Sequence, residues 1–465
     1  MFKVLILAGG IGKRMKSKIP KIFHNIIDKP MIEYVVKLAF GLNPDEVAIV
    51  LGKWYDEKRY GEYFKSKNMS IFMQSEPLGT GHAISCAMDF LEGEGDILIL
   101  YGDVPLLRFD TIERMRRAHL EEKNDMTILT AIVEDPAGYG RVVRRDGRVR
   151  MIVEDADANE EQKSIREINS GIYMFKIPVL RKNLKYLRNE NKQGEYYLTD
   201  LVEILDERKY KIGTVMVEDP DEITGVNTRK QLVDVERKMR YRIMDELMEN
   251  GVTIEDPDTT FIGSEVKIGM DTIVKPMTFI FGDTEIGEDC VIGPNVFLED
   301  SKLGKGVRMS FSHCQCVTIE DEVTIGPFSR LRPGTHIKKN VKIGNFVEVK
   351  NSIISENSRA SHLSYIGDAF VGKNVNIGAG TITCNYDGFK KNRTEIEDGA
   401  FIGSNSSLVA PVKIGKDSII GAGSVITEDV PPDSLGIGRG RQVNKIGWAK
   451  SWREKKRAER SVEGE

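Results

Sequence analysis

The hydrophobic pattern of the first half of the chain is that of alternating strands and helices. Residues 4–7 and 97–100 are short apolar runs, typical of strands that are buried on both faces of a sheet. Stretches with a helical pattern, such as residues 31–40 and 108–122, lie between such runs. This alternation predicts a mostly parallel sheet that is covered by helices and extends over residues 1–226.

Two later segments break the alternation. Residues 139–155 contain Asp146-Gly147, a tight-turn signal between two alternating runs, and so predict a hairpin whose many arginines form its solvated face. Residues 228–250 contain no Gly or Pro and repeat apolar side chains at spacings of three and four, which predicts one long helix with a single apolar stripe. Asn250-Gly251 ends this helix, and we interpret residues 227–250 as the connector between two domains.

The second half of the chain follows a six-residue period. Thirteen pairs of an aliphatic residue and a glycine occur between Ile262-Gly263 and Ile420-Gly421, at gaps that are often 6, 12 or 18 residues. We expect the aliphatic side chains to stack inward from coil to coil, and the glycines to turn corners where a side chain would clash or φ is positive. A gap of 18 residues is three hexads, so residues 251–448 predict a three-sided parallel β-helix. The polar insertion at residues 383–394 interrupts the repeat and is a candidate functional segment.

Composition excludes several classes of protein. The net charge of −4 argues against a general binder of nucleic acid or other polyanions. No apolar stretch approaches the ~20 residues that span a bilayer, and the N-terminal residues do not resemble a signal peptide. The five cysteines form no disulfide framework, which fits a reducing cytoplasm. Cys314 and Cys316 lack zinc-site partners and are interpreted as small core or surface residues.

A glycine-rich loop follows the first predicted strand. In residues 7–15, small residues let backbone N–H groups close on phosphates, and Lys13 and Arg14 supply positive charge. The spacing matches neither the P-loop nor the dinucleotide-binding fingerprint. Asp103 directly follows residues 97–100 and therefore lies near the carboxyl end of a strand, where open α/β sheets bind ligands. A carboxylate there suits Mg²⁺, a hard ion that prefers oxygen ligands.

This loop and a series of later motifs together resemble the sugar-1-phosphate nucleotidyltransferases. In chain order the motifs are residues 7–15, Pro20-Lys21, Gln74, 78–83, 101–105, 138–141, Glu154, 167–171, 195–200 and 225–227. Joined to hexapeptide repeats, they are similar to the bifunctional bacterial GlmU family, which combines a glucosamine-1-phosphate acetyltransferase with an N-acetylglucosamine-1-phosphate uridylyltransferase. The resemblance runs from residue 3 to about residue 448.

The resemblance also implies the architecture. It predicts a Rossmann-like nucleotidyltransferase domain with a mixed sheet at residues 1–226, a linker helix at 227–250, and an acetyltransferase domain at 251–448. The latter is expected to be a left-handed β-helix. This handedness rests on the resemblance alone, because crossovers between parallel strands are normally right-handed. The enzyme is expected to be cytoplasmic and to form a homotrimer through the β-helix.

For the first domain, the resemblance implies a site for UTP and UDP-N-acetylglucosamine. Its residues would be Leu7, Ala8, Gly9, Gly10, Arg14, Lys21, Gln74, Gly79, Thr80, Tyr101, Gly102, Asp103, Gly140, Glu154, Asn169 and Asn227. Within this set, Asp103 and Asn227 would hold Mg²⁺ and Lys21 would meet the phosphates. The loop departs from the common family form, because Gly9 stands where many members have Ala and should only widen or loosen the loop. Ile11 and Lys13 replace a usual Lys and Thr, which moves the positive charge to position 13.

For the second domain, the resemblance implies that His362 is the general base. An imidazole can accept a proton at neutral pH, and the target would be the 2-amine of glucosamine-1-phosphate. The sugar phosphate would be bound by Arg332, Lys350, Tyr365 and Asn376, and acetyl-CoA by Ala379, Asn385, Tyr386, Ser404, Ala422 and Arg439. Arg441 stays open as an alternative to Arg439. In the family the acyl site lies between neighbouring β-helices, so residues 383–394 would reach a partner.

Three alternatives stay open from the sequence. The β-helix could serve only to oligomerise a glucose-1-phosphate thymidylyl- or uridylyltransferase. The chain could also be a non-enzymatic scaffold, like the nucleotidyltransferase-like subunits of translation-factor exchange complexes, although those tend to lose residues such as Asp103, Lys21 and Asn227. The basic tail at residues 449–465 is expected to be solvated and frayed, the alternative being that it supplies charge near the CoA phosphates.

Overall fold

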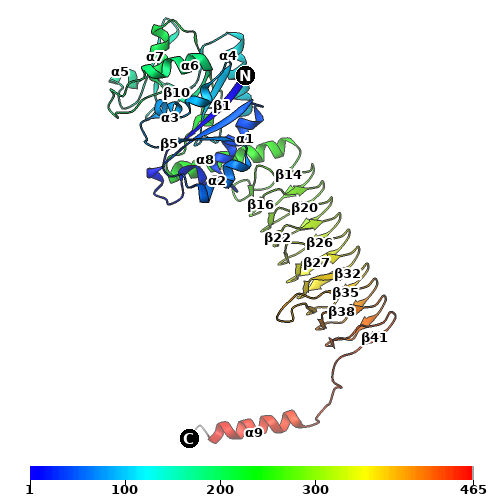
Figure 1. The fold of residues 1–465 in the computed structure, drawn as a ribbon. Coiled ribbons are helices and arrows are strands. Elements are labelled where there is room, and N and C mark those ends of the chain that lie inside the picture. The colour runs from blue at the N-terminus through cyan, green and yellow to red at the C-terminus, as the bar shows by residue number, and fades with distance from the viewer. Residues whose placement is uncertain (463–465) are drawn as a thin grey trace. The chain divides into compact units, whose positions relative to one another are not determined.

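The computed structural model describes residues 1–462 and divides the chain into two compact units, Met1–Arg242 and Ile243–Glu465. The division falls inside helix α8 (Arg229–Glu249), which Figure 1 shows in green. The stripe predicted for this helix is confirmed, because Leu232, Val235 and Met239 are buried. Gly251 ends the helix with a φ of 89°, a conformation that glycine adopts without strain.

The first unit is built on a mixed sheet with the strand order β11-β7-β10-β6-β1-β4-β5. Its strands are β1 (Phe2–Ala8), β4 (Glu46–Gly52), β5 (Ser70–Gln74), β6 (Asp96–Tyr101), β7 (Met126–Ile132), β10 (Glu167–Lys176) and β11 (Ile212–Met216). All neighbours pair in parallel except β10, which is antiparallel to both β6 and β7. The mixed sheet is therefore confirmed.

The sheet separates two hydrophobic cores. Val4 and Ile6 of β1 pack into one core, whereas Leu5 and Leu7 pack into the other. This alternation explains the uninterrupted apolar run, because successive side chains of a strand point to opposite faces. The helices of this unit are α1 (Met31–Gly41), α2 (Glu57–Ser66), α3 (Thr80–Ser85), α4 (Phe109–Glu121), α5 (Glu160–Lys163), α6 (Ile177–Asn183) and α7 (Asp200–Glu207). The helical patterns at residues 31–40 and 108–122 are thus confirmed as α1 and α4.

The predicted hairpin is also present, as β8 (Arg141–Arg145) and β9 (Arg148–Val153). The expectation that its arginines are solvated is wrong for Arg141, which is only 2% exposed. Its guanidinium donates to Asp155 at 2.8 Å and to the carbonyl oxygen of Tyr139. A buried arginine is tolerated only when it is paired in this way.

The second unit is a β-helix with three parallel sheets. They run from β12 (Thr253–Ile254) to β41 (Leu435–Gly436), from β13 (Phe261–Ile262) to β40 (Val425–Ile426), and from β14 (Lys267–Ile268) to β38 (Val412–Ile414). Figure 1 shows its coils following one another in chain order from green to orange. Aliphatic residues stack in register, as in Ile325 on Ile343 on Ala360. Cys314 belongs to such a buried column, and Cys316 is exposed.

Glycines occur at the corners of the coils for the two expected reasons, which are the lack of space for a side chain and a positive φ. A β-carbon on Gly287 would lie 2.7 Å from the carbonyl carbon of Gly304 one coil away, and Gly326 has a φ of 98°. Each sheet contributes one two- to four-residue strand per coil, so the repeat depends on tight turns at every corner.

The chain departs from the β-helix at two places. Residues 385–393 leave it between β34 (Ile382–Cys384) and β35 (Thr394–Ile396), which agrees with the predicted insertion. The expectation of a solvated tail is confirmed for residues 449–460, which are exposed. The expectation that this tail is frayed is wrong up to residue 462, because Trp448–Val462 form helix α9; residues 463–465 lie outside the described part of the chain. Among residues 1–462, no helix has the length and apolar character to cross a membrane.

Candidate active sites

A pocket of about 270 Å³ lies beyond the carboxyl ends of β1, β5 and β6. Ligands of open α/β sheets bind at this edge. The pocket is lined by Leu7, Ala8, Gly9, Gly10, Lys21, Ile22, Gln74, Pro77, Gly79, Thr80, Ala83, Tyr101, Asp103 and Glu195. Most of the residues that the sequence assigned to the nucleotide sugar therefore come together here, although they lie far apart along the chain.

The loop after β1 is held close to Lys21. Gly12 has a φ of 74°, and a β-carbon there would lie 2.7 Å from Cβ of Lys21. The indole nitrogen of Trp54 donates to the carbonyl oxygen of Ala8 at 3.3 Å, and Met15 is buried beneath the loop's end. These contacts keep the loop in one shape, with the lysine beside it.

Gln74 fills the space on the other side of this loop. Its amide nitrogen donates to the carbonyl oxygen of Gly79 at 3.0 Å and lies 3.2 Å from Nδ1 of His82. Its amide oxygen occupies the place that a β-carbon on Gly9 would take. An alanine at this position would therefore require the end of the flexible Gln74 side chain to move.

Lys21, Asp103 and Asn227 meet at one side of the pocket. The Lys21 ammonium is ion-paired with Asp103 and donates to Oδ1 of Asn227 at 3.0 Å. The backbone N–H of Val226 donates to the carbonyl oxygen of Asp103 at 2.9 Å. Because Lys21 is only 9% exposed, its charge is weakly screened by solvent. Two side-chain oxygens that could bind a metal thus lie beside one buried cation.

These donors fit a hard divalent cation. Mg²⁺ is commonly held by one or two carboxylates, with the remaining positions filled by water and substrate phosphates. Within residues 1–462, no group of three or more His, Cys, Asp or Glu side chains could hold a metal ion. A metal at Asp103 and Asn227 would take its remaining ligands from water and substrate phosphates.

The residues assigned to the sugar form a second cluster. The backbone N–H of Asn169 donates to the carbonyl oxygen of Gly140 at 2.8 Å, and the Asn169 side chain donates to the hydroxyl of Tyr173 at 2.6 Å. Glu154 accepts a hydrogen bond from Thr199 at 3.0 Å. Burial raises the pKa of Glu154, with that hydrogen bond acting against the shift. The cluster is thus rigid and polar, as recognition of sugar hydroxyls requires.

Besides Asn227 and the three residues of the sugar cluster, two further assigned residues lie outside the pocket lining. Arg14 is exposed on a short helical turn (Lys13–Met15), and Gly102 packs behind the loop against Ala8. In turn, the sequence assignment omitted Ile22, Pro77, Ala83 and Glu195. Glu195 lies in the 195–200 motif that carried the resemblance, so that motif contained a usable signal for it.

On the β-helix, the residues assigned to the sugar phosphate occupy successive coils. Arg332 donates to Glu348 at 2.9 Å, and Glu348 pairs in register with Tyr365. Asn385 donates to the Tyr365 hydroxyl at 3.4 Å and to Asp368 at 2.5 Å. This polar face brings an arginine, a tyrosine and an asparagine of the predicted acyl site together.

His362 lies beside this face at an exposed position. It is the last residue of β30 (Arg359–His362), where it pairs with Asn345 of β27 (Lys342–Asn345). Leu363 follows with a φ of 49° and turns the corner toward Tyr365. Asn376 pairs with Arg359 one coil further on. The exposed imidazole is thus accessible to a substrate amine.

Three of the residues assigned to acetyl-CoA form a column along one corner. The N–H of Asn405 donates to Ala379 at 2.7 Å, and the N–H of Gly423 donates to Ser404 at 2.8 Å. Arg439 donates to the carbonyl oxygen of Ala422 at 2.5 Å. Ala379, Ser404 and Ala422 therefore follow one another coil by coil, and Arg439 reaches the end of the column.

Comparison with known proteins identifies the families that the two units resemble. Residues 3–252 match the nucleotidyl transferase family, residues 393–428 match the bacterial transferase hexapeptide family, and residues 313–386 match a GMPPB C-terminal domain. Proteins named Bifunctional protein GlmU are similar over nearly the whole chain. That of Thermosipho africanus is 55% identical (95% of each chain) and that of Thermotoga petrophila 56% (96% of this chain, 98% of that one). That of Carboxydothermus hydrogenoformans is 48% identical (96% and 99%).

A pH-dependent stability is expected from the carboxylates near the sugar cluster. Burial, with Glu154, Glu203 and Asp157 nearby, raises the pKa of Asp200 to about 6. A carboxyl group with a raised pKa takes up protons on folding, so the free energy of unfolding of the first unit falls as the pH rises from about 4 to about 6. Asp200→Asn should remove this penalty and raise the thermal midpoint more at pH 7 than at pH 4, as scanning calorimetry can measure.

Asp89→Asn, at an exposed aspartate of the same unit, is the matched control. Its effect on the midpoint should be the same at both pH values. An Asp200→Asn protein that differs from the wild type equally at pH 4 and pH 7 would contradict the raised pKa.

Proposed function

This chain belongs to the family of bifunctional GlmU proteins, and on that premise we propose how its residues divide the two activities. It is a nucleotidyltransferase fused to a left-handed hexapeptide-repeat β-helix acetyltransferase, and it makes UDP-N-acetylglucosamine. We propose that residues 1–226 form the domain for uridylyl transfer, with Asn227 at the start of the connecting segment 227–250 contributing to its site, and that residues 251–448 carry acetyl transfer. The observation that supports this most directly is the meeting of Lys21, Asp103 and Asn227 beside the pocket.

In the uridylyl-transfer site, the sugar phosphate of N-acetylglucosamine-1-phosphate attacks the α-phosphorus of UTP. One P–O bond forms, the α–β bridge breaks, and pyrophosphate leaves with the electron pair. Such reactions need alignment and charge neutralisation more than covalent help. The loop at residues 7–15 and Lys21 would neutralise the triphosphate, Gln74 would read the base, and Glu154 with Asn169 would hold the sugar.

Family membership implies a divalent metal, which we propose to be Mg²⁺ held by Asp103 and Asn227. When bound, it supplies positive charge to the phosphate oxygens. Lys21 bonds to both proposed ligands, so binding of the metal and triphosphate would draw the ammonium toward the phosphates.

In the acetyl-transfer site, the 2-amine of glucosamine-1-phosphate attacks the thioester carbon of acetyl-CoA. A C–N bond forms, the C–S bond breaks, and the proton of the amine goes by way of His362 to the CoA thiolate. Arg332 and Lys350 would bind the phosphate, and Tyr365 and Asn376 would orient the sugar. Acetylation would come first, so that its product is the substrate of uridylyl transfer.

We further propose a homotrimer joined through the β-helix. Large apolar residues line one corner of successive coils, among them Phe311, Phe328, Phe346 and Leu363. Each has a positive φ of 45–59°, which is costly for a bulky residue, and Phe328 and Phe346 are 53% and 58% exposed. An exposed apolar ridge built on strained backbone supports an interface with further copies of the chain.

The five cysteines are all free. This fits a reducing compartment, and we propose the bacterial cytoplasm as the place of action.

Asp103→Asn should reduce metal-dependent release of pyrophosphate from UTP by about 100-fold or more, because it removes the charged ligand of the proposed metal. Acetyl transfer in the same preparation should be unchanged and serves as the folding control. Retention of full uridylyl transfer would count against the metal assignment.

His362→Ala should impair acetyl transfer and leave uridylyl transfer intact. Release of CoA thiol from acetyl-CoA and glucosamine-1-phosphate should fall by about 100-fold or more, because general bases contribute factors of this size. Uridylyl transfer to N-acetylglucosamine-1-phosphate should be unchanged. Equal loss of both activities in a folded protein would contradict the proposal that the two reactions take place at separate sites.

Phe346→Lys should break the proposed trimer, because it places a charge on the apolar ridge of every copy. Sedimentation equilibrium should then give a mass near the 52.3 kDa of one chain instead of about three times that value. Phe40→Lys, at an exposed phenylalanine of the first unit, is the matched control and should leave the mass unchanged. A wild-type protein that sediments as a monomer would refute the proposal.

A further inference from the structure

The two proposed metal ligands come from segments that the sheet does not hold together. Asp103 follows β6, and Asn227 lies beyond the segment that follows β11. In the strand order β11-β7-β10-β6, two other strands separate β11 from β6. Ladder hydrogen bonds between neighbours therefore do not set the separation of Asp103 and Asn227, and other contacts must do so.

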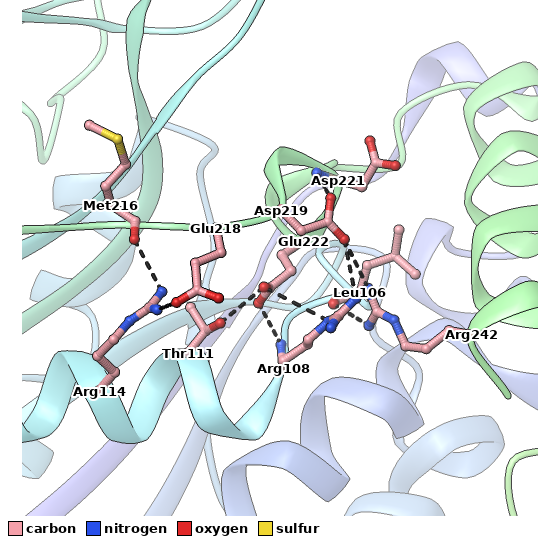
Figure 2. Close-up of polar contacts among 10 residues, drawn as sticks. All are labelled: Leu106, Arg108, Thr111, Arg114, Met216, Glu218, Asp219, Asp221, Glu222 and Arg242. Carbon is pink, nitrogen blue, oxygen red and sulfur yellow. Dashed lines mark hydrogen bonds and ion pairs between the residues drawn. The ribbon is translucent and has the colours of Figure 1, made fainter. Parts of the chain in front are cut away.

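A polar cluster joins these two segments, as Figure 2 shows. At its centre is Glu222, whose side chain is 2% exposed. One carboxylate oxygen accepts from the backbone N–H of Arg108 at 3.0 Å, and the other accepts from the hydroxyl of Thr111 at 3.0 Å. Arg108 and Thr111 form the beginning of α4, directly after the Asp103 segment. Glu222 thus attaches the Asn227 segment to the start of α4.

Three arginines make further contacts within this cluster, and Nε of Arg108 also approaches the Glu222 carboxylate, at 3.9 Å. Arg108 donates to Asp219 at 3.2 Å, and Arg242 of α8 donates to the carbonyl oxygen of Leu106 at 2.6 Å. Arg114 donates to the carbonyl oxygen of Met216 at 3.1 Å and pairs with Glu218. The ion pairs of Asp219 and Glu218 are partly exposed and contribute little on their own. The buried bonds of Glu222 are the strong ones, because their loss would leave donors unpaired away from water.

The connection reaches the proposed metal ligands through residues 223–226, whose first and last side chains are buried. Ile223 and Val226 are 2% and 0% exposed, and the Val226 N–H is the group that bonds to the carbonyl oxygen of Asp103. A shift of Glu222 is therefore transmitted to Val226 and to its neighbour Asn227.

We propose that Glu222 is a positioning residue for uridylyl transfer, holding Asn227 at the separation from Asp103 that a shared metal ion requires. This inference rests on the proposed assignment of Asp103 and Asn227 as ligands. Gln74 and Gly79, which would read the base, belong to β5 and the start of α3 and make none of these contacts. A change at Glu222 should therefore weaken metal binding and spare nucleotide binding.

The test is direct titration with Mn²⁺, followed by electron paramagnetic resonance of the free ion, in the presence of UTP. Glu222→Gln keeps the shape but loses one acceptor. The Kd for Mn²⁺ should rise by about 10-fold or more, the size of effect seen when a group that orients a metal ligand is removed. Affinity for metal-free UTP and the rate of acetyl transfer should change by less than about 2-fold, since neither depends on the metal pair.

A second variant and a control distinguish a role of Glu222 in positioning Asn227 from a general loss of protein stability. Thr111→Val removes one of the same two contacts without touching a carboxylate and should raise the Kd for Mn²⁺ by a smaller factor. Thr127→Val removes buried hydrogen bonds with His119 and Asn124 at the start of β7 and should leave Mn²⁺ binding unchanged.

Wild-type Mn²⁺ affinity in both Glu222→Gln and Thr111→Val would overturn the inference, as would an equal loss in Thr127→Val. The Asp103→Asn variant distinguishes a wrong role for Glu222 from a wrong metal assignment. If Asp103→Asn also binds Mn²⁺ like the wild type, the metal assignment is wrong. If only Asp103→Asn loses Mn²⁺, the metal assignment stands and the role of Glu222 is refuted.

Discussion

The buried meeting of Lys21, Asp103 and Asn227 is the interaction on which the first unit depends. It brings a cation and two oxygen donors into a place with little solvent, where unpaired charges would be costly. The loop after β1 closes over Lys21 because Gly12 allows the approach. The segment after β11 is tied across the sheet by Val226 and Glu222. These contacts place the ion pair and its neighbouring oxygen ligands at the edge of the pocket.

The β-helix of the second unit is stabilised mainly by the stacking of its coils. A short strand buries little by itself, so stability comes from stacking one coil on the next. Every corner must then turn tightly, and asparagine, aspartate, glycine and even phenylalanine adopt positive φ there. The same stacking places outward residues in columns, which is why Ala379, Ser404 and Ala422 follow one another along one corner. A repetitive core therefore yields an ordered row of surface groups.

Particular residues show where sequence reasoning about the site succeeded and failed. Asp103 could be placed because it follows a buried strand, and ligands gather at that edge. The neighbour of Gly9 could not be identified from the sequence, because Gln74, which lies beside it, belongs to another strand. Arg141 was expected in solvent, yet a partner fourteen residues further on, Asp155, lets it be buried. Glu222 gave no signal at all, since a single glutamate in a polar stretch is ordinary.

Periodicity is local, so the sequence by itself determined the elements. The two-residue and 3.6-residue patterns predicted strands and helices, the hexad predicted the β-helix, and ordered motifs predicted the family. Packing of the whole sheet decides which strands are neighbours. The same packing decides which distant segments of the chain come into contact. The family motifs implied that Asp103 and Asn227 lie together, but only the tertiary structure decided that Lys21 contacts both side chains and that Glu222 joins their segments. The physical reason is that a buried charge is stabilised by whatever group folding brings to it, and residue type alone does not reveal that partner.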